Sequence, residues 1–185
     1  MKIGIIIVAV VILLVVLWVV FSYNSLVKKK LKVEESFSTM DVYLKKRFDL
    51  IPNLVATVKG YAKHETETLE KVIAERNSGV KKTTAENIQD ENSISGALRQ
   101  IFALTESYPD LKANTNFMNL MEQLKRIEEE IANSRKYYNA IVKEFNVAVM
   151  TVPTNIVASI FHFEKQQMFV VDSNDERKNV EVNFD

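Results

Sequence analysis

The sequence contains no cysteine and few residues that interrupt helices. Its 185 residues include four glycines, three prolines and two histidines. Without cysteine the chain has no disulfide, no thiol nucleophile and no cysteine-bound metal. The small number of glycines and prolines leaves little material for turns, so the sequence predicts long helices. The glycines stand apart from one another, which excludes a glycine-rich phosphate-binding loop.

Positive and negative charges balance along this chain. Lysine and arginine together number 24, as do aspartate and glutamate, so the formal net charge is zero at pH 7. Both signs are mixed along the sequence, and no broad basic surface of the kind that binds nucleic acid is expected. The composition therefore predicts no nucleic-acid partner.

The first long segment of the chain is apolar throughout. Residues 3–21 read IGIIIVAVVILLVVLWVVF, and a helix over them is about 28 Å long, close to the ~30 Å hydrocarbon core of a bilayer. Trp18 and Tyr23 lie near its C-terminal edge, where amphipathic rings favour the lipid–water interface. A cleaved signal peptide is the alternative, but such peptides have shorter apolar regions and end in small residues. We expect a retained transmembrane anchor over residues 1–23.

Lysines on either side of the apolar run give the anchor a direction. Lys2 precedes the run and four lysines follow it closely, so the positive-inside rule places residues 24–185 on the cytoplasmic side as one domain. The same four lysines can also attract anionic lipid headgroups, by about 1 kcal/mol each. The candidate headgroup contacts are Lys28, Lys29, Lys30 and Lys32.

Apolar residues recur at three- and four-residue spacing from residue 33 to Pro153. This spacing predicts amphipathic helices that bury one face each. The expected fold is all-α, with an antiparallel four-helix bundle after the transmembrane helix. The cleanest pattern covers residues 117–149 and predicts a helix of about 35 residues, roughly 50 Å long.

Turns and a C-terminal extension complete the expected architecture. Residues 77–92 are polar and predict a loop, and residues 108–114 predict a turn that contains a proline and two Asx side chains. After Pro153 we expect a short helix and a short extended C-terminal segment packed on one end of the bundle. Its last residues, 180–184, alternate in polarity like an edge strand.

Pro52 is unfavourable inside the first bundle helix, but the apolar spacing continues in phase on both sides of it. A proline inside a helix removes an amide donor and clashes with the preceding turn, so it either kinks a continuous helix or begins a new one. We favour the second alternative, in which Asp49 caps a second helix. That helix carries apolar residues from Leu54 to Ile73 and ends near residues 77–79.

No set of residues has the spacing of a catalytic or metal site. A zinc hydrolase needs two histidines one helical turn apart beside a glutamate, but His64 and Glu65 have no second histidine nearby. The other histidine, His162, lies far away in the sequence. We therefore expect no catalytic residue, no metal, no cofactor and no small-molecule substrate.

A set of polar residues near the second helix and the turn at Pro109 is the best candidate for a functional surface. The ordinary interpretation is a solvated helix face with a helix cap. The alternative is a contact surface for a partner protein at one end of the bundle, because polar side chains at a turn are not needed for core packing. The candidate partner surface comprises Asp49, Asn53, Lys59, Tyr61, His64, Glu65, Asp110 and Asn114.

Short motifs spread along nearly the whole chain agree with one family pattern. They are YNxLV at 23–27, DVxLKKRxDLIPNLV at 41–55, VKGYAxHE at 58–65, YPDLKAN at 108–114, IAxxRxxYN at 131–139 and PTNIVA at 153–158. With these motifs the chain resembles the LemA family of bacterial membrane proteins. The resemblance implies an N-terminal membrane anchor and an antiparallel four-helix bundle, and it favours a helix boundary at Pro52.

The chain departs from the family pattern at three places. Lys30 and Leu31 replace an Arg-Asn pair, Phe37 replaces a tryptophan, and His162 replaces the glycine of a Phe-Gly-Phe motif. The family has no established catalytic residues, so the resemblance implies an architecture and not an activity.

These features predict a membrane-anchored interaction or adaptor protein with no catalytic activity of its own. Its expected partners are the lipid bilayer and another membrane or membrane-associated protein. We expect a single-pass protein of the bacterial cytoplasmic (inner) membrane with its bundle on the cytoplasmic side. Two alternatives remain. One is a hydrolase that uses His64 with nearby carboxylates, and the other is a lipid-surface organising protein that acts through the juxtamembrane lysines.

Overall fold

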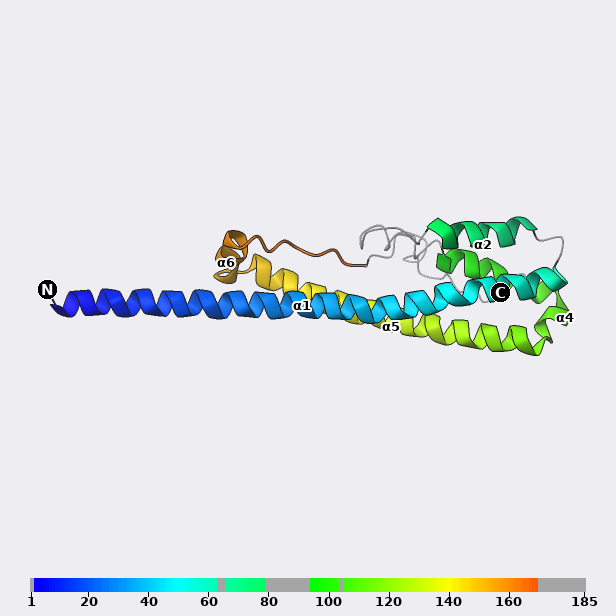
Figure 1. Cartoon of the computed structure of the whole chain (residues 1–185), viewed down its shortest axis with the longest axis horizontal. Coiled ribbons are helices and arrows are strands. Elements are labelled where there is room, and N and C mark those ends of the chain that lie inside the picture. The colour runs from blue at the N-terminus through cyan, green and yellow to red at the C-terminus, as the bar shows by residue number, and fades with distance from the viewer. Residues whose placement is uncertain (1, 63–65, 79–93, 104, 170–185) are drawn as a thin grey trace, which may run out of the picture. The chain divides into compact units, whose positions relative to one another are not determined.

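The computed structural model describes residues 2–62, 66–78, 94–103 and 105–169. Within these ranges the chain is all-α, with no strand (Figure 1). The elements are α1 (Lys2–Tyr61), α2 (Thr66–Ser78), a helix over residues 94–103, a 3-10 turn (Thr105–Ser107), α4 (Pro109–Lys112), α5 (Thr115–Met150) and α6 (Thr154–Ile160). The predicted edge segment at 180–184 and most of the predicted loop at 77–92 lie outside the described residues.

The first helix is much longer than the sequence predicts. Helix α1 runs without interruption through 60 residues, and Pro52 lies inside it. The predicted helix boundary at Pro52, with Asp49 as a cap, is therefore wrong. The residues assigned to a second helix are divided between the last turns of α1 and the separate helix α2. The end of α2 at Ser78 agrees with the predicted stop.

A contact from α2 explains how α1 continues through Pro52. Because proline has no N–H, the carbonyl oxygen of Phe48, one turn earlier, loses its helical partner. Arg76 of α2 replaces that partner, since its Nε donates to the Phe48 oxygen at 3.3 Å. The Arg76 guanidinium also lies 3.9 Å from the centroid of the Phe48 ring, a cation–π contact. Pro52 is exposed, so its ring does not displace a packed neighbour.

Buried residues on the two longest helices follow a seven-residue repeat. Such a repeat marks the face of a helix that packs on its neighbours. The buried series on α5 is Phe117, Leu124, Ile131, Tyr138 and Phe145, and the series on α1 is Leu26, Val33, Met40, Arg47 and Leu54. Helix α5 covers 36 residues, which confirms the long helix predicted over residues 117–149.

The structure divides into two compact units, and α1 and α5 contribute to both. The first unit draws its described residues from Met1–Lys45 and Ile127–Met168, and the second from Lys46–Arg126 and Phe169–Asp185. Each unit has its own core.

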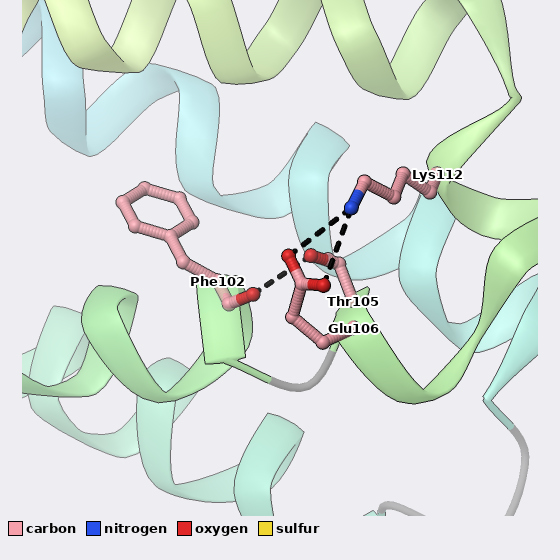
Figure 2. Close-up of polar contacts among 4 residues, drawn as sticks. All are labelled: Phe102, Thr105, Glu106 and Lys112. Atoms are coloured by element: carbon pink, nitrogen blue, oxygen red, sulfur yellow. Dashed lines mark hydrogen bonds and ion pairs between the residues drawn. The ribbon is translucent and has the colours of Figure 1, made fainter.

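The core of the second unit joins the end of α1 to four shorter pieces of the chain. Its buried side chains come from α1, α2, the helix of residues 94–103, α4 and the first turns of α5. They include Ile51, Leu54, Val58, Leu69, Val72, Leu98, Ile101, Leu111, Phe117 and Leu124. Figure 2 shows the polar contacts that close the connection into α4. Thr105 donates to the Phe102 carbonyl at 2.7 Å, and Lys112 Nζ lies 3.2 Å from both Glu106 carboxylate oxygens.

In the first unit α1 and α5 lie side by side and run in opposite directions (Figure 1). Lys29 of α1 forms an ion pair with Glu144 of α5. Further along, the rings of Phe37 and Tyr138 meet edge to face, with centroids 5.9 Å apart. These contacts place residues early in α1 beside residues late in α5.

Helix α6 and the segment after it return along α5. The predicted short helix after Pro153 is confirmed, and it ends in a Schellman motif: the Phe163 amide donates to the Ala158 carbonyl and the His162 amide to the Ser159 carbonyl. His162 has a φ of 57°, the left-handed region that favours glycine. The family pattern has glycine at this position because the backbone there needs a positive φ. In this chain His162 adopts that conformation at a steric cost.

The segment after α6 is held through its main chain. Asn146 Oδ1 accepts from the Gln166 amide and Asn146 Nδ2 donates to the Gln166 carbonyl, each at 2.8 Å. Tyr138 Oη donates to the Gln167 carbonyl at 3.1 Å, and burial raises the pKa of the Tyr138 phenol, which keeps it protonated as a donor. Residues 164–168 are thus bound to α5 as a non-helical segment, and residues 170–185 of the predicted C-terminal extension lie outside the described residues.

The link between Pro52 and Arg76 predicts a coupled effect on stability. We expect Arg76→Met to weaken the docking of α2 by about 2 kcal/mol, because it removes a charged hydrogen bond and a cation–π contact. In a Pro52→Ala background the amide of residue 52 can again bond the Phe48 carbonyl. The same Arg76→Met change should then cost only about 1 kcal/mol.

Hydrogen exchange of the α2 amides in the full chain measures both costs, since exchange reports the local opening of that helix. Lys71→Met, at an exposed position on the same helix, is the matched control and should leave exchange nearly unchanged. Equal effects of Arg76→Met in the two backgrounds would contradict the proposed role of Arg76.

Candidate functional site

The structure brings two members of the predicted partner surface into direct contact. Asn114 Nδ2 donates to Tyr61 Oη at 2.8 Å, which joins the start of α5 to the end of α1. The other atom of the same amide, Asn114 Oδ1, accepts from the Phe117 amide at 2.9 Å and so caps α5. Asn114 is half-buried and Tyr61 is exposed. One asparagine therefore fixes the geometry at this end of the second unit.

The other described members of that surface are distributed along α1 and α4. Lys59 is exposed near the end of α1, and Asp110 is exposed on α4. Asp49 and Asn53 are exposed one turn apart on α1, but the helical rise separates Asp49 from Tyr61 by about 18 Å. The contact of Tyr61 with Asn114 and the position of Asp49 thus belong to different ends of this surface.

His64 and Glu65 lie outside the described residues. They are the last two members of the predicted surface and the residues of the hydrolase alternative. Within the described ranges no group of three or more histidine, aspartate and glutamate side chains is arranged to hold a metal ion.

Arg47 is a residue that the sequence analysis missed. It occupies a position in the seven-residue series of α1 and is only 1% exposed, which makes it one of the largest fully buried side chains. Its Nη1 donates to Ser95 Oγ at 3.0 Å, across to the helix of residues 94–103. A charge removed from water must be partnered, and such a partner also selects the register in which helices pack. The repeat, counted in sevens from Leu26, was the signal that could have placed Arg47 inside.

The four juxtamembrane lysines are not equivalent in the structure. Lys28, Lys30 and Lys32 are exposed, whereas Lys29 is half-buried and paired with Glu144. The hydrogen bond and charge of Lys29, together with the charge of Lys32, hold the pKa of Glu144 below its ordinary value. The pair borders an open groove of about 530 Å³ between α1 and α5, which Lys143 also lines. Three of the lysines therefore remain available to a membrane surface.

Comparisons with known proteins agree with the motifs in the sequence. Residues 36–184 match the LemA family model. Protein LemA of Metamycoplasma hominis is 31% identical over 140 residues, which cover 73% of this chain and 63% of that protein. Magnetosome protein MamQ 2 of Paramagnetospirillum magneticum is 22% identical over 174 residues, which cover 80% of this chain and 64% of that protein. The chain thus spans less than two thirds of the length of these curated relatives.

The double role of Asn114 predicts an order of stabilities. Asn114→Ala removes the cap and the bond to Tyr61, and we expect it to cost about 1 kcal/mol. Asn114→Asp keeps the cap oxygen and places a negative charge at the start of α5, so it should cost less than half as much. Thermal unfolding of the full chain in detergent, followed by circular dichroism, measures the difference.

Tyr61→Phe serves as the control, because it removes only the bond between the two helices and leaves the cap intact. Equal losses for the alanine and aspartate variants would show that Asn114 does not act as a cap.

Proposed function

The chain belongs to the LemA family, and on that premise we propose that it is a membrane-anchored interaction protein without catalytic activity of its own. Its role is to hold a helical bundle at the membrane surface, where the bundle binds another membrane or membrane-associated protein. Confinement to the membrane raises the effective concentration of such a partner, so weak contacts suffice for capture.

The exposure of the first part of α1 is the observation that carries this proposal. Among the described residues, α1 is the one helix long and apolar enough to cross a membrane. From Ile3 to Leu17 its side chains are exposed, including Ile3 at 76% and Ile5 at 68%. Apolar side chains in such a continuous array need an apolar solvent, and a bilayer supplies one. Because α1 has no break after this array, the anchor passes directly into the rest of the helix.

The helices of the chain support a bundle as the part that binds. We propose that α1, α2, the helix of residues 94–103 and α5 form an antiparallel four-helix bundle in the cytoplasm, beside the bacterial inner membrane. Their shared core in the second unit supports this arrangement. The exposed polar residues Asn53, Lys59, Tyr61 and Asp110 are the surface that we assign to a protein partner. We also assign the exposed Lys28, Lys30 and Lys32 to contacts with anionic headgroups.

Crosslinking in living cells tests the proposed partner contact. A photo-crosslinking residue at Asn53 or Asp110 should capture a discrete membrane protein, and the same residue at Lys136, in the other unit, should not. Deleting residues 2–17, whose side chains are exposed in the structure, should reduce the capture by about tenfold or more, because the effective concentration falls. Capture of the same protein at full yield without these residues would contradict the role of the anchor.

The absence of cysteine gives a direct test of orientation. Single cysteines at Lys2 and at Asn53 can be labelled with a membrane-impermeant maleimide in intact spheroplasts. We expect the cysteine at position 2 to react from outside and the cysteine at position 53 to react only after lysis, as the flanking lysines require. The reverse pattern would place the bundle on the outer side.

A further inference from the structure

The junction of α5 and α6 is an uncharged segment. Between Glu144 and Glu164 the sequence has no lysine, arginine, aspartate or glutamate, and apart from the N-terminal run no other stretch of the chain is as long without a charge. We call residues 145–163 the elbow. It contains the end of α5, a short turn and the whole of α6.

The elbow is apolar on its exposed side as well as on its packed side. Val157 and Ala158 are buried and belong to a small core that Leu26 of α1 shares. On the surface, six large apolar side chains of the elbow are nearly half or more exposed. They are Val152 at 78%, Ile160 at 63%, Met150 at 58%, Ile156 at 53%, Val147 at 49% and Phe161 at 46%.

Contacts within the first unit place the elbow beside the end of the anchor. Trp18 and Val19, both within the apolar run, pack against the core that Val157 and Ala158 form. The ring of Tyr23 meets the rings of Phe161 and Phe163, with centroids 4.7 and 5.8 Å apart. Phe21 is the last residue of the apolar run, and Trp18 lies about 5 Å from it toward the N-terminal end of the anchor. The elbow therefore reaches the depth at which the anchor enters lipid.

We propose that the elbow inserts into the lipid–water interface of the leaflet beside the anchor, as a contact of this chain with the membrane in addition to the anchor and the juxtamembrane lysines. The inference rests on the proposed anchor, because the position of the bilayer along α1 sets the depth of the elbow. Elements that lie in the interface bury their apolar face by roughly 5–10 Å, which matches the reach of the elbow below Phe21.

Two hydroxyl groups of the elbow form hydrogen bonds within the chain. Thr151 Oγ1 donates to the Val147 carbonyl at 2.8 Å, and Thr154 Oγ1 donates to the Ala148 carbonyl at 2.7 Å. Both hydroxyl groups are thus satisfied by the chain itself, which lowers the cost of leaving water. Lys143 and Glu144 on one side, and Glu164 and Lys165 on the other, mark where the charged surface resumes.

Fluorescent probes on single cysteines in the full chain can locate the elbow. The cysteine-free chain is labelled with nitrobenzoxadiazole at Ile156→Cys or Ile160→Cys and placed in phosphatidylcholine–phosphatidylglycerol vesicles. Quenching by nitroxide on the lipid acyl chains then reports contact with lipid, and quenching by iodide reports contact with water. Lys136→Cys, exposed on α5 of the same unit, is the water-exposed control, and Val15→Cys reports the anchor.

We expect lipid-borne nitroxide to quench the probes at positions 156, 160 and 15. Quenching of these probes by iodide should be weaker than that of the probe at position 136, by a factor of about three or more. Elbow probes open to iodide, together with a lipid-exposed probe at position 15, would overturn the elbow contact and leave the anchor intact. A water-exposed probe at position 15 would overturn the anchor itself. Elbow probes shielded from both quenchers would also overturn the elbow contact, because protein, such as a second copy of the chain, would then cover the elbow.

A charge substitution supplies an independent measurement. Ile156→Asp, at an exposed position, should abolish lipid quenching of the probe at position 160, because a carboxylate opposes insertion. Tyr137→Asp is the matched control, since Tyr137 is also an exposed apolar residue, at 56%, but lies outside the elbow. Lipid quenching that survives Ile156→Asp would contradict the proposal.

Discussion

The continuity of α1 through Pro52 is the constraint on which the rest of the structure depends. The same helix supplies Met40 to the interior of the first unit and Ile51 and Val58 to the core of the second. A break at Pro52 would release the turns on which α2 packs. The hydrogen bond from Arg76 to the Phe48 carbonyl removes the main cost of passing a proline, an unpaired backbone acceptor. One side chain on a separate helix therefore maintains the element that both units share.

Local sequence patterns correctly predicted the helices whose ends are marked by residues close by in the sequence. Helix α5 and the short helix α6 follow from apolar spacing and from Pro153, and the apolar start of α1 follows from composition alone. The prediction at Pro52 was wrong because the missing amide donor is evident from the local sequence, whereas the compensating Arg76 lies 28 residues after Phe48, whose carbonyl it binds. Arg47 was missed for a similar reason. A charged residue suggests a solvated face, and only the seven-residue repeat or its contact with Ser95 shows that it is inside.

The candidate surfaces show the same limit. The sequence grouped Tyr61 and Asn114 in one candidate surface without establishing that they are close, and the hydrogen bond between them shows their proximity. The sequence did not distinguish Lys29, which forms an ion pair with Glu144, from the three exposed lysines near it. Nor did it identify the elbow, because apolar residues after Pro153 read equally well as core. Which of them are covered is decided by packing between distant parts of the chain.

The attachment of residues 164–168 to α5 has a consequence for how this segment can vary. The hydrogen bonds that Asn146 and Tyr138 form with this segment go to main-chain groups, the amide and carbonyl of Gln166 and the carbonyl of Gln167. Recognition of the main chain is indifferent to sequence, in the way that pairing between strands is. The segment can therefore exchange its side chains during evolution and display new ones on the surface, while the two helix residues that secure it stay the same.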